Sequence, residues 1–200
     1  MTNVGVRERR NVVDAVARVL TEVCAPWVVN IVSSMVIGIA VGAPGWGAFV
    51  ALCAGVVPMA VILAGMRRAT IGDHHVSKID ERHVLIVVLL TVVLVGLVVQ
   101  IVAGAPIEMI AFMSAGLVAL AVAAVITSIF HWKVSVHTGV SAGVTVVLAL
   151  AVSPWWLLAS VLTPLVGWSR VHLGAHTRAQ VVVGALTGAV AAGATYALIA

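Results

Sequence analysis

The sequence predicts an all-α protein, a polytopic transmembrane helix bundle of six to seven helices, and three observations lead to this class. Hydrophobic residues make up 62% of the 200-residue chain and charged residues only 9%, far below the roughly 25% of an ordinary soluble domain. Apolar runs of about 20 residues, the length that crosses a bilayer as a helix, recur along the chain. The short alternating segments of a membrane β-barrel do not occur.

Apolar segments separated by glycine and proline are expected to form the membrane helices. Their approximate bounds are 23–42, 46–66, 84–103, 109–130, 136–153, 155–168 and 179–200. The sequences GAPGWG, AGAPIE and VSPWW follow the first, third and fifth segments and predict turns. The sixth segment has only 14 residues, so we expect its helix to continue through Ser169 and Arg170.

The N-terminal stretch differs from the rest of the chain because charged residues interrupt it throughout. It lacks the long apolar run of a secretory signal. We therefore expect residues 1–22 to form a cytoplasmic amphipathic lead-in and residues 23–200 to form a single membrane-embedded domain.

Small residues within the segments indicate how the helices pack. Two glycine pairs have the GxxxG spacing that lets helix backbones approach closely, namely Gly139/Gly143 and Gly184/Gly188. Cys24 and Cys53 lie in apolar segments and have the spacing of neither a zinc site nor a disulfide framework. We interpret both cysteines as small buried hydrophobic residues.

The distribution of positive charge predicts the orientation. Seven spans would bring four stretches to one side of the membrane: the N-terminus, 67–83, 131–135 and 169–178. All eleven lysine and arginine residues fall on that side, and the opposite connections carry none. By the positive-inside rule this side is cytoplasmic. We expect a multi-pass plasma-membrane protein whose N-terminus and polar stretches face the cytoplasm.

Polar chemistry is concentrated in three stretches at segment ends. They are 66–83 (MRRATIGDHHVSKIDERH), 131–138 (HWKVSVHT) and 169–180 (SRVHLGAHTRAQ), and together they hold all seven histidines. Because each lies at a helix end, the three can converge at one membrane interface. No HExxH pattern or Cys/His pair is present, so we expect no metal and no other cofactor. Nothing in the chain indicates nucleic-acid binding.

The third stretch combines residues suited to phosphate chemistry. Arg170 carries a fixed planar cation that matches phosphate oxygens. His176, six residues later, has the side chain of a nucleophile or an acid–base catalyst. Gln180 lies four residues beyond His176, on the same helix face. Its amide can accept a hydrogen bond from one ring nitrogen of His176 and so fix the tautomer.

These residues resemble the type-2 phosphatidic acid phosphatases, a family of integral membrane lipid phosphatases with the motifs K-x6-R-P, P-S-G-H and S-R-x5-H-x3-D. The third motif corresponds to Ser169-Arg170, His176 and Gln180, with glutamine at the aspartate position. The stretch is also similar to the H-T-x-x-Q variant of dolichyl-diphosphatase-like members. The second motif corresponds to VSVHT, with Ser135 and His137. The first corresponds to His75, Arg82 and, in place of proline, His83.

The resemblance, which covers roughly residues 67–190, implies a metal-independent mechanism through a phosphohistidine. His176 would attack phosphorus, and His137 would protonate the leaving oxygen and later accept a proton from water. The phosphate oxygens would be held by Arg82, Arg170, Ser135 and His75. Further charge or support would come from Lys78 or Lys133, from Asp73 as a compensating carboxylate, and from Ser169.

The function that this implies is hydrolysis of a lipid phosphate monoester or diphosphate. A polyprenyl phosphate is the favoured substrate, followed by phosphatidic acid or phosphatidylglycerophosphate. The partners would be the membrane lipid substrate and the bilayer, and self-association is left open. Three alternatives remain: a lipid phosphotransferase, a catalytically inactive protein that binds lipid headgroups, and a transporter. Against transport, Gln100 is the only strongly polar residue deep in the third or fourth segment.

Overall fold

The computed structural model is helical throughout the part of the chain that it describes, which is 3–67 and 79–200 for the backbone and 11–67 and 86–200 for the side chains. In chain order the helices are α1 (Asn3–Val23), α2 (Pro26–Ala40), α3 (Pro44–Ala51), the π-helix η1 (Leu52–Val56), α4 (Val57–Arg67), α5 (Ile79–Val102), α6 (Ile107–Ile129), α7 (Val136–Ala151), the 3₁₀-helix η2 (Pro154–Val161), α8 (Leu162–His172) and α9 (Arg178–Ile199). These ranges contain no strand, which confirms the all-α prediction.

The helices follow the predicted apolar segments closely, with two exceptions. α5 starts five residues before its segment, within the polar stretch, and α8 continues to His172. The second exception confirms the expectation that the sixth helix includes Ser169 and Arg170. Proline limits several helices, because Pro26, Pro44 and Pro154 each stand at the first or second helical position.

Among the described residues, three continuous helices are long and apolar enough to cross a membrane: Pro44–Arg67, Ile107–Ile129 and Arg178–Ile199. Asn11–Val23 and Pro26–Ala40 would make a fourth span if taken together, with a bend of 46° between them. Val136–Ala151 and Ile86–Val102, the part of α5 whose side chains are described, are apolar but shorter. Length and composition thus support three or four membrane-crossing helices among the described residues, and the predicted six to seven are not confirmed.

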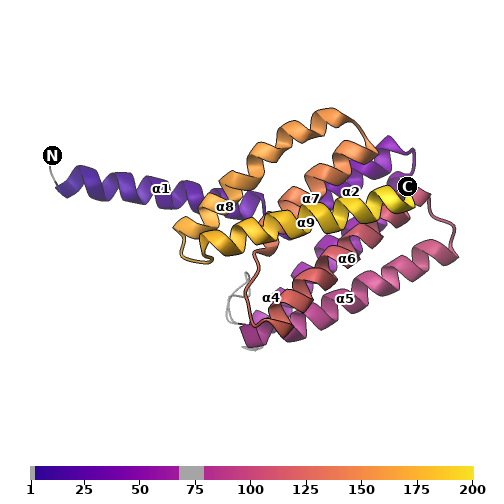
Figure 1. Cartoon of the computed structure of the whole chain (residues 1–200), viewed down its shortest axis with the longest axis horizontal. Helices are drawn as coiled ribbons and strands as arrows, with labels where there is room; N and C mark the ends of the chain where they lie inside the picture. The colour runs from indigo at the N-terminus through magenta and orange to yellow at the C-terminus, as the bar shows by residue number, and fades with distance from the viewer. Residues whose placement is uncertain (1–2, 68–78) are drawn as a thin grey trace.

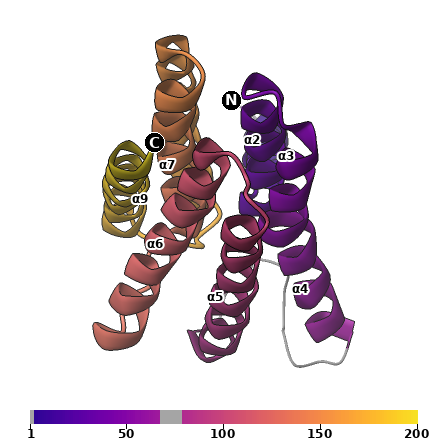
Figure 2. The same ribbon diagram turned by 90° about the vertical axis from the view of Figure 1, so that its right-hand side faces the viewer.

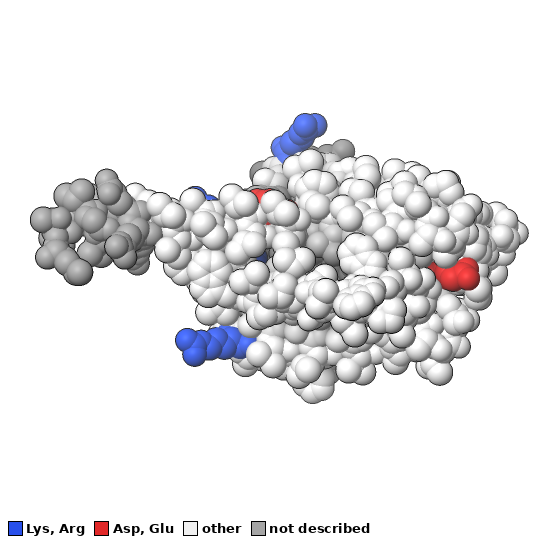
Figure 3. All heavy atoms as spheres, turned by 90° about the horizontal axis from the view of Figure 1, so that it is seen from above, with Lys and Arg blue, Asp and Glu red and all other residues white. Residues whose placement is uncertain are grey.

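Successive helices from α2 onward run back and forth, so that their connections gather at two ends (Figure 1). One end carries residues 131–135, the connection 173–177 between α8 and α9, and the first turns of α7 and α9, and we call it the polar end. α1 projects from this end (Figure 1). In the space-filling view, the coloured lysine and arginine side chains lie in the half of the bundle that bears α1, and most of the remaining described surface is uncharged (Figure 3).

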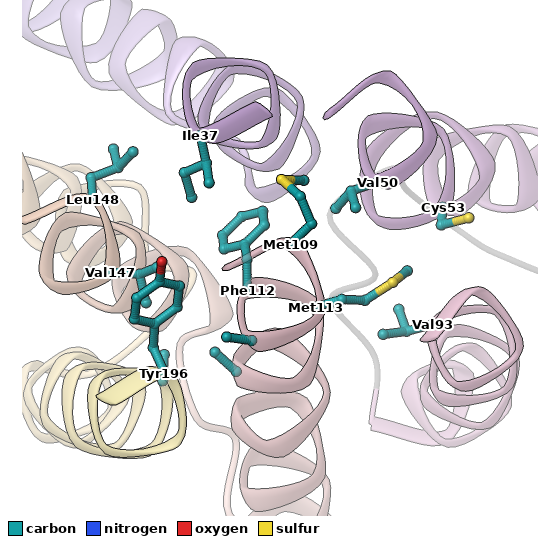
Figure 4. Close-up of a cluster of buried hydrophobic side chains, with 13 residues drawn as sticks. Ile37, Val50, Cys53, Val93, Met109, Phe112, Met113, Val147, Leu148 and Tyr196 are labelled. Carbon is teal, nitrogen blue, oxygen red and sulfur yellow. The ribbon is translucent and has the colours of Figure 1, made fainter. Parts of the chain in front are cut away.

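The packed core lies in the half of the bundle opposite the polar end. α6 lies between α7 and α9 on one side and α2, α3 and α5 on the other (Figure 2). Its residues Met109, Phe112 and Met113 point among the surrounding helices (Figure 4). They meet Ile37, Val50, Cys53, Val93, Val147, Leu148 and Tyr196. Cys24 and Cys53 are buried free cysteines, which confirms their interpretation as buried residues.

The two GxxxG pairs bring α7 and α9 into backbone contact, a close approach that the glycine spacing permits. A Cβ on Gly139 would lie 3.1 Å from the carbonyl oxygen of Gly184, and one on Gly143 would lie 3.0 Å from that of Gly188. A Cβ on Gly188 would overlap the backbone of Gly139. Only glycine permits this separation, and the contact fixes the start of α7 beside the start of α9.

The π-helix between α3 and α4 has a local cause. Pro58 has no N–H, so the carbonyl of Ala54 cannot receive the usual helical hydrogen bond from the residue four positions later. The side-chain amide of Asn30 on α2 supplies the missing donor, with Nδ2 3.1 Å from the Ala54 oxygen. A proline thus disturbs the helix, and a polar residue on the neighbouring helix compensates.

Candidate active site

The spacing between Arg170 and His176 is set by the way α8 ends. The N–H of Gly174 donates to the carbonyl of Val171 at 3.0 Å, and the N–H of Ala175 donates to that of Arg170 at 3.0 Å. These two bonds form a Schellman motif, in which Gly174 adopts the left-handed conformation with φ +68°. The N–H of His176 also donates to the Arg170 carbonyl, at 3.2 Å. The chain therefore folds back directly over Arg170 before α9 begins.

α9 begins with a capping box that includes Gln180. Thr177 is the N-cap, and its hydroxyl accepts a hydrogen bond from the N–H of Gln180 at 3.3 Å. In return, Oε1 of Gln180 accepts the N–H of Thr177 at 3.0 Å. The same Oε1 lies 3.2 Å from Nδ1 of His176, so the hydrogen bond expected from the sequence is present.

The capping box also determines which nitrogen of His176 carries the proton. A reversed Gln180 amide would place its NH₂ group against the N–H of Thr177, donor against donor, so the oxygen must occupy that position. Since an acceptor then faces Nδ1, Nδ1 is the protonated nitrogen. In the neutral ring Nε2 keeps its lone pair and is available as a nucleophile.

The segment before α7 packs against this region. Nζ of Lys133 donates to the carbonyl of Ala175 at 3.1 Å, which places a cation next to the backbone that precedes His176. The N–H of Ser135 donates to the carbonyl of Gln180 at 3.3 Å. Lys133 and Ser135, far from the third stretch in sequence, therefore lie beside it in the fold.

Ser135 and the following residues form the start of α7. Ser135 is its N-cap, and its hydroxyl accepts the N–H of Thr138 at 3.5 Å. The Thr138 hydroxyl donates to the carbonyl of Val181 on α9 at 2.9 Å. His137 lies in the first turn of α7 and is buried. The amino-terminal ends of α7 and α9 are thus adjacent, and both helix dipoles favour an anion there.

Arg170 and Ser169 lie near the end of α8, and both are buried. Arg170 is only 3% exposed, and Ser169 is fully buried. The Ser169 hydroxyl donates to the carbonyl of Val166 at 2.8 Å and lies 3.1 Å from the hydroxyl of Thr21 on α1. Ser169 therefore joins α8 to α1, and the structure places it in the support of the site.

A cavity of about 270 Å³ connects the predicted catalytic residues to the interior of the bundle. Ser135, His137 and His176 line its polar end. The rest of its wall comes from α2, from the continuous helix α3–η1–α4, and from α5, α6, α7 and α9, and it is almost entirely apolar. Its deeper polar residues already bond to helix carbonyls in two cases, Asn30 to Ala54 and Thr187 to Val183. The site is thus an apolar chamber with two imidazoles at one end.

Part of the predicted site lies outside the described residues. This is the case for Asp73, His75 and Lys78, and for the side chain of Arg82. The backbone of Arg82 belongs to α5, four residues before Ile86, which lines the cavity. The structure thus brings together Lys133, Ser135, His137, Arg170, His176 and Gln180, and the first predicted motif stays a prediction.

The sequence analysis missed Thr177 and Thr138, which hold the two helix starts in place. The Thr-x-x-Gln pattern of a capping box was the available signal for Thr177. Thr138 had no such signal, because its bond to Val181 joins residues far apart in the chain.

No group of three or more histidine, cysteine, aspartate or glutamate residues in the described part of the chain is placed to hold a metal ion. Comparison of the chain with profiles of protein families, with curated proteins and with solved structures found no significant match.

Proposed function

We propose that the protein is a membrane lipid phosphatase that hydrolyses a phosphate monoester or diphosphate of a lipid through a phosphohistidine. The observation that carries the proposal is that His137, in the first turn of α7, and His176, in the connection between α8 and α9, line one end of a cavity whose remaining wall is almost entirely apolar. The imidazole end would suit the phosphate group of an amphiphilic substrate, and the apolar chamber would suit its hydrocarbon tail.

In the first step, Nε2 of His176 attacks phosphorus and the bond from phosphorus to the leaving oxygen breaks. His137, as the imidazolium, gives its proton to that oxygen. Arg170, Lys133 and the amino-terminal end of α7 stabilise the charge that develops on the phosphoryl oxygens. The hydrogen bond to Gln180 keeps His176 in the reactive tautomer.

In the second step, water attacks the phosphohistidine and His137 accepts its proton. The bond between nitrogen and phosphorus breaks, and Nε2 recovers its electron pair. A monoester yields an alcohol and inorganic phosphate, whereas a diphosphate yields a lipid monophosphate and inorganic phosphate. No metal is required for either step.

The substrate is a polyprenyl phosphate or diphosphate in preference to phosphatidic acid or phosphatidylglycerophosphate. The apolar chamber supports a lipid, and the resemblance of the H-T-x-x-Q stretch supports the polyprenyl class. In this proposal six to seven helices cross the plasma membrane, with the N-terminus and the site on the cytoplasmic side. The lysine and arginine residues at the polar end support that orientation.

The test is phosphate release by purified protein in detergent, with polyprenyl phosphates and diphosphates, phosphatidic acid and phosphatidylglycerophosphate as substrates and a chelator present. We expect His176→Ala to reduce release at least about 10³-fold, because the nucleophile is lost. The matched control is His172→Gln. His172 is the last residue of α8, four positions before His176, and it stacks on Trp168 and pairs with Asp14 at 2.7 Å. We expect this control to retain activity within about twofold.

Other results would count against the proposal in distinct ways. If wild type releases phosphate from none of the four lipids, the protein is not this phosphatase. Equal losses in His176→Ala and His172→Gln would contradict the assignment of the nucleophile. If phosphate instead appears on an added alcohol or lipid acceptor, the protein is the phosphotransferase alternative, because the same phosphohistidine would then be discharged by an acceptor other than water.

A further inference from the structure

The cavity follows one face of α6 away from the polar end. The residues of α6 that line it recur at helical spacing, and among them are Phe112, Ala115, Gly116, Ala119, Ala123 and Thr127. From Thr127, near the polar end, to Phe112 in the core, the helix rises about 22 Å at 1.5 Å per residue. The chamber is therefore long in the direction of the helices, a shape suited to an extended chain.

Small side chains make this wall wide enough for such a chain. Between Phe112 and Thr127, the face of α6 toward the cavity presents mainly alanine and glycine. The facing walls of α7 and α9 present Gly139 and Gly188. These two glycines also support the contact between α7 and α9, so their place is explained by packing.

Gly116 is different, because no packing contact explains it. Apart from its own stretch of α6, no heavy atom lies within 4 Å of the position its Cβ would occupy, and the residue is exposed and lines the cavity. Its φ is not in the left-handed region, so the backbone does not require glycine there. The missing side chain therefore leaves open space in the chamber. Gly116 lies about 16 Å along α6 from Thr127.

We infer that Gly116 sets the length of lipid tail that the chamber accepts, an inference that rests on the proposed lipid phosphatase. A tail that enters from the imidazole end runs along α6 and passes Gly116 only if it is longer than about 16 Å. A large side chain at position 116 closes the chamber at that depth. Tails that end before Gly116 stay clear of this block, and longer tails meet it.

The kinetic test compares geranyl phosphate, whose tail is shorter than this depth, with geranylgeranyl phosphate, whose tail is longer. In Gly116→Phe we expect the ratio of kcat/KM for the long substrate to that for the short one to fall about tenfold or more. The control is Val118→Phe. Val118 lies about 200° around α6 from Gly116, is 39% exposed and is not among the residues that line the cavity. In Val118→Phe the ratio of kcat/KM for the two substrates should not change. An unchanged ratio in Gly116→Phe, or the same fall in both variants, would overturn the inference.

A second test does not depend on hydrolysis. A geranylgeranyl phosphonate with a photoreactive diazirine at the tail end should crosslink to α6 between Phe112 and Gly116, and Gly116→Phe should abolish this product while Val118→Phe retains it. Crosslinks confined to other helices, or equal in both variants, would refute the tail position. If the expected crosslink forms but no lipid is hydrolysed, the tail site stands and the proposed phosphatase activity fails.

Discussion

Nδ1 of His176 lies 3.2 Å from Oε1 of Gln180, and the same oxygen accepts the backbone N–H of Thr177 at 3.0 Å. One amide oxygen thus serves both the start of α9 and the imidazole that we propose as the nucleophile. Because the backbone bond fixes the direction of the amide, the tautomer of His176 follows from the cap of the helix. Stability of the helix start and orientation of the ring are therefore coupled through Gln180.

Substitutions of Gln180 test this coupling. Gln180→Ala removes both hydrogen bonds, and we expect stability to fall by about 1 kcal/mol and kcat by about 100-fold, because His176 loses its orientation. Gln180→Glu keeps an acceptor for both donors and should retain activity. The measurements are the melting temperature in detergent and kcat. A variant Gln180→Ala with lower stability but normal kcat would show that the amide only caps the helix.

The two arginines of the third stretch differ in burial and should differ in effect. Arg170 is 3% exposed, whereas Arg178 is exposed at the start of α9. Removal of a protein cation that contacts the phosphoryl oxygens in the transition state lowers the rate by about 10²-fold or more. We therefore expect Arg170→Gln to lower kcat/KM by about 100-fold and Arg178→Gln to change it less than about threefold. Similar losses in both variants would favour a general electrostatic effect on the anionic substrate.

Gly174 should be required for the bend between α8 and α9. Its φ of +68° lies in the left-handed region, where a residue with a side chain costs about 1–2 kcal/mol. We expect Gly174→Val to lower the melting temperature and the activity, and Gly174→Asn to do so less, because asparagine tolerates this conformation. Gly45→Ala, at a glycine with ordinary φ and open surroundings, is the control. Equal melting temperatures for Gly174→Val and wild type would contradict the assigned conformation.

The contact between α7 and α9 predicts which glycines tolerate a methyl group. In Gly188→Ala the added Cβ overlaps the backbone of Gly139, so we expect a loss of about 1–3 kcal/mol of stability together with reduced activity. Gly116→Ala adds the same group where there is space and should not lower stability. Thermal unfolding in detergent distinguishes the two variants. If Gly188→Ala is as stable as wild type, the two helices are not in backbone contact.

A double-mutant cycle tests the account of the π-helix. Asn30→Leu removes the donor to the Ala54 carbonyl and should cost about 1–3 kcal/mol of stability. In the Pro58→Ala background, residue 58 regains its N–H and can bond to that carbonyl. We therefore expect Asn30→Leu to cost less in this background, with a coupling energy of at least about 0.5 kcal/mol. Additive effects on the melting temperature would show that Asn30 does not compensate for Pro58.

The sequence by itself determined the elements of the fold. Composition and run length predicted helices, and glycine and proline marked most of their ends, because these signals act within a few residues of the backbone. These local signals do not settle how many helices cross the membrane. The sequence pattern predicts six to seven, whereas length and composition support three or four among the residues whose side chains are described. α7 has only 16 residues, and the helix that leads into α8 starts as a 3₁₀-helix.

The candidate site was only partly predictable. Arg170, His176 and Gln180 were predicted from residue types and spacing, whereas His137 was predicted only from the resemblance. The link from Gln180 to His176 followed because the two residues are only four positions apart, at the start of α9. By contrast, Lys133 bonds to Ala175 and Thr138 bonds to Val181, and the residues of each pair are about 40 positions apart in the chain. Such contacts depend on the rotation and separation of α7 and α9, which the glycine pairs allow but do not specify alone. The chamber along α6 is likewise a product of tertiary structure, because its wall is shared by six helices and no single segment encloses any volume.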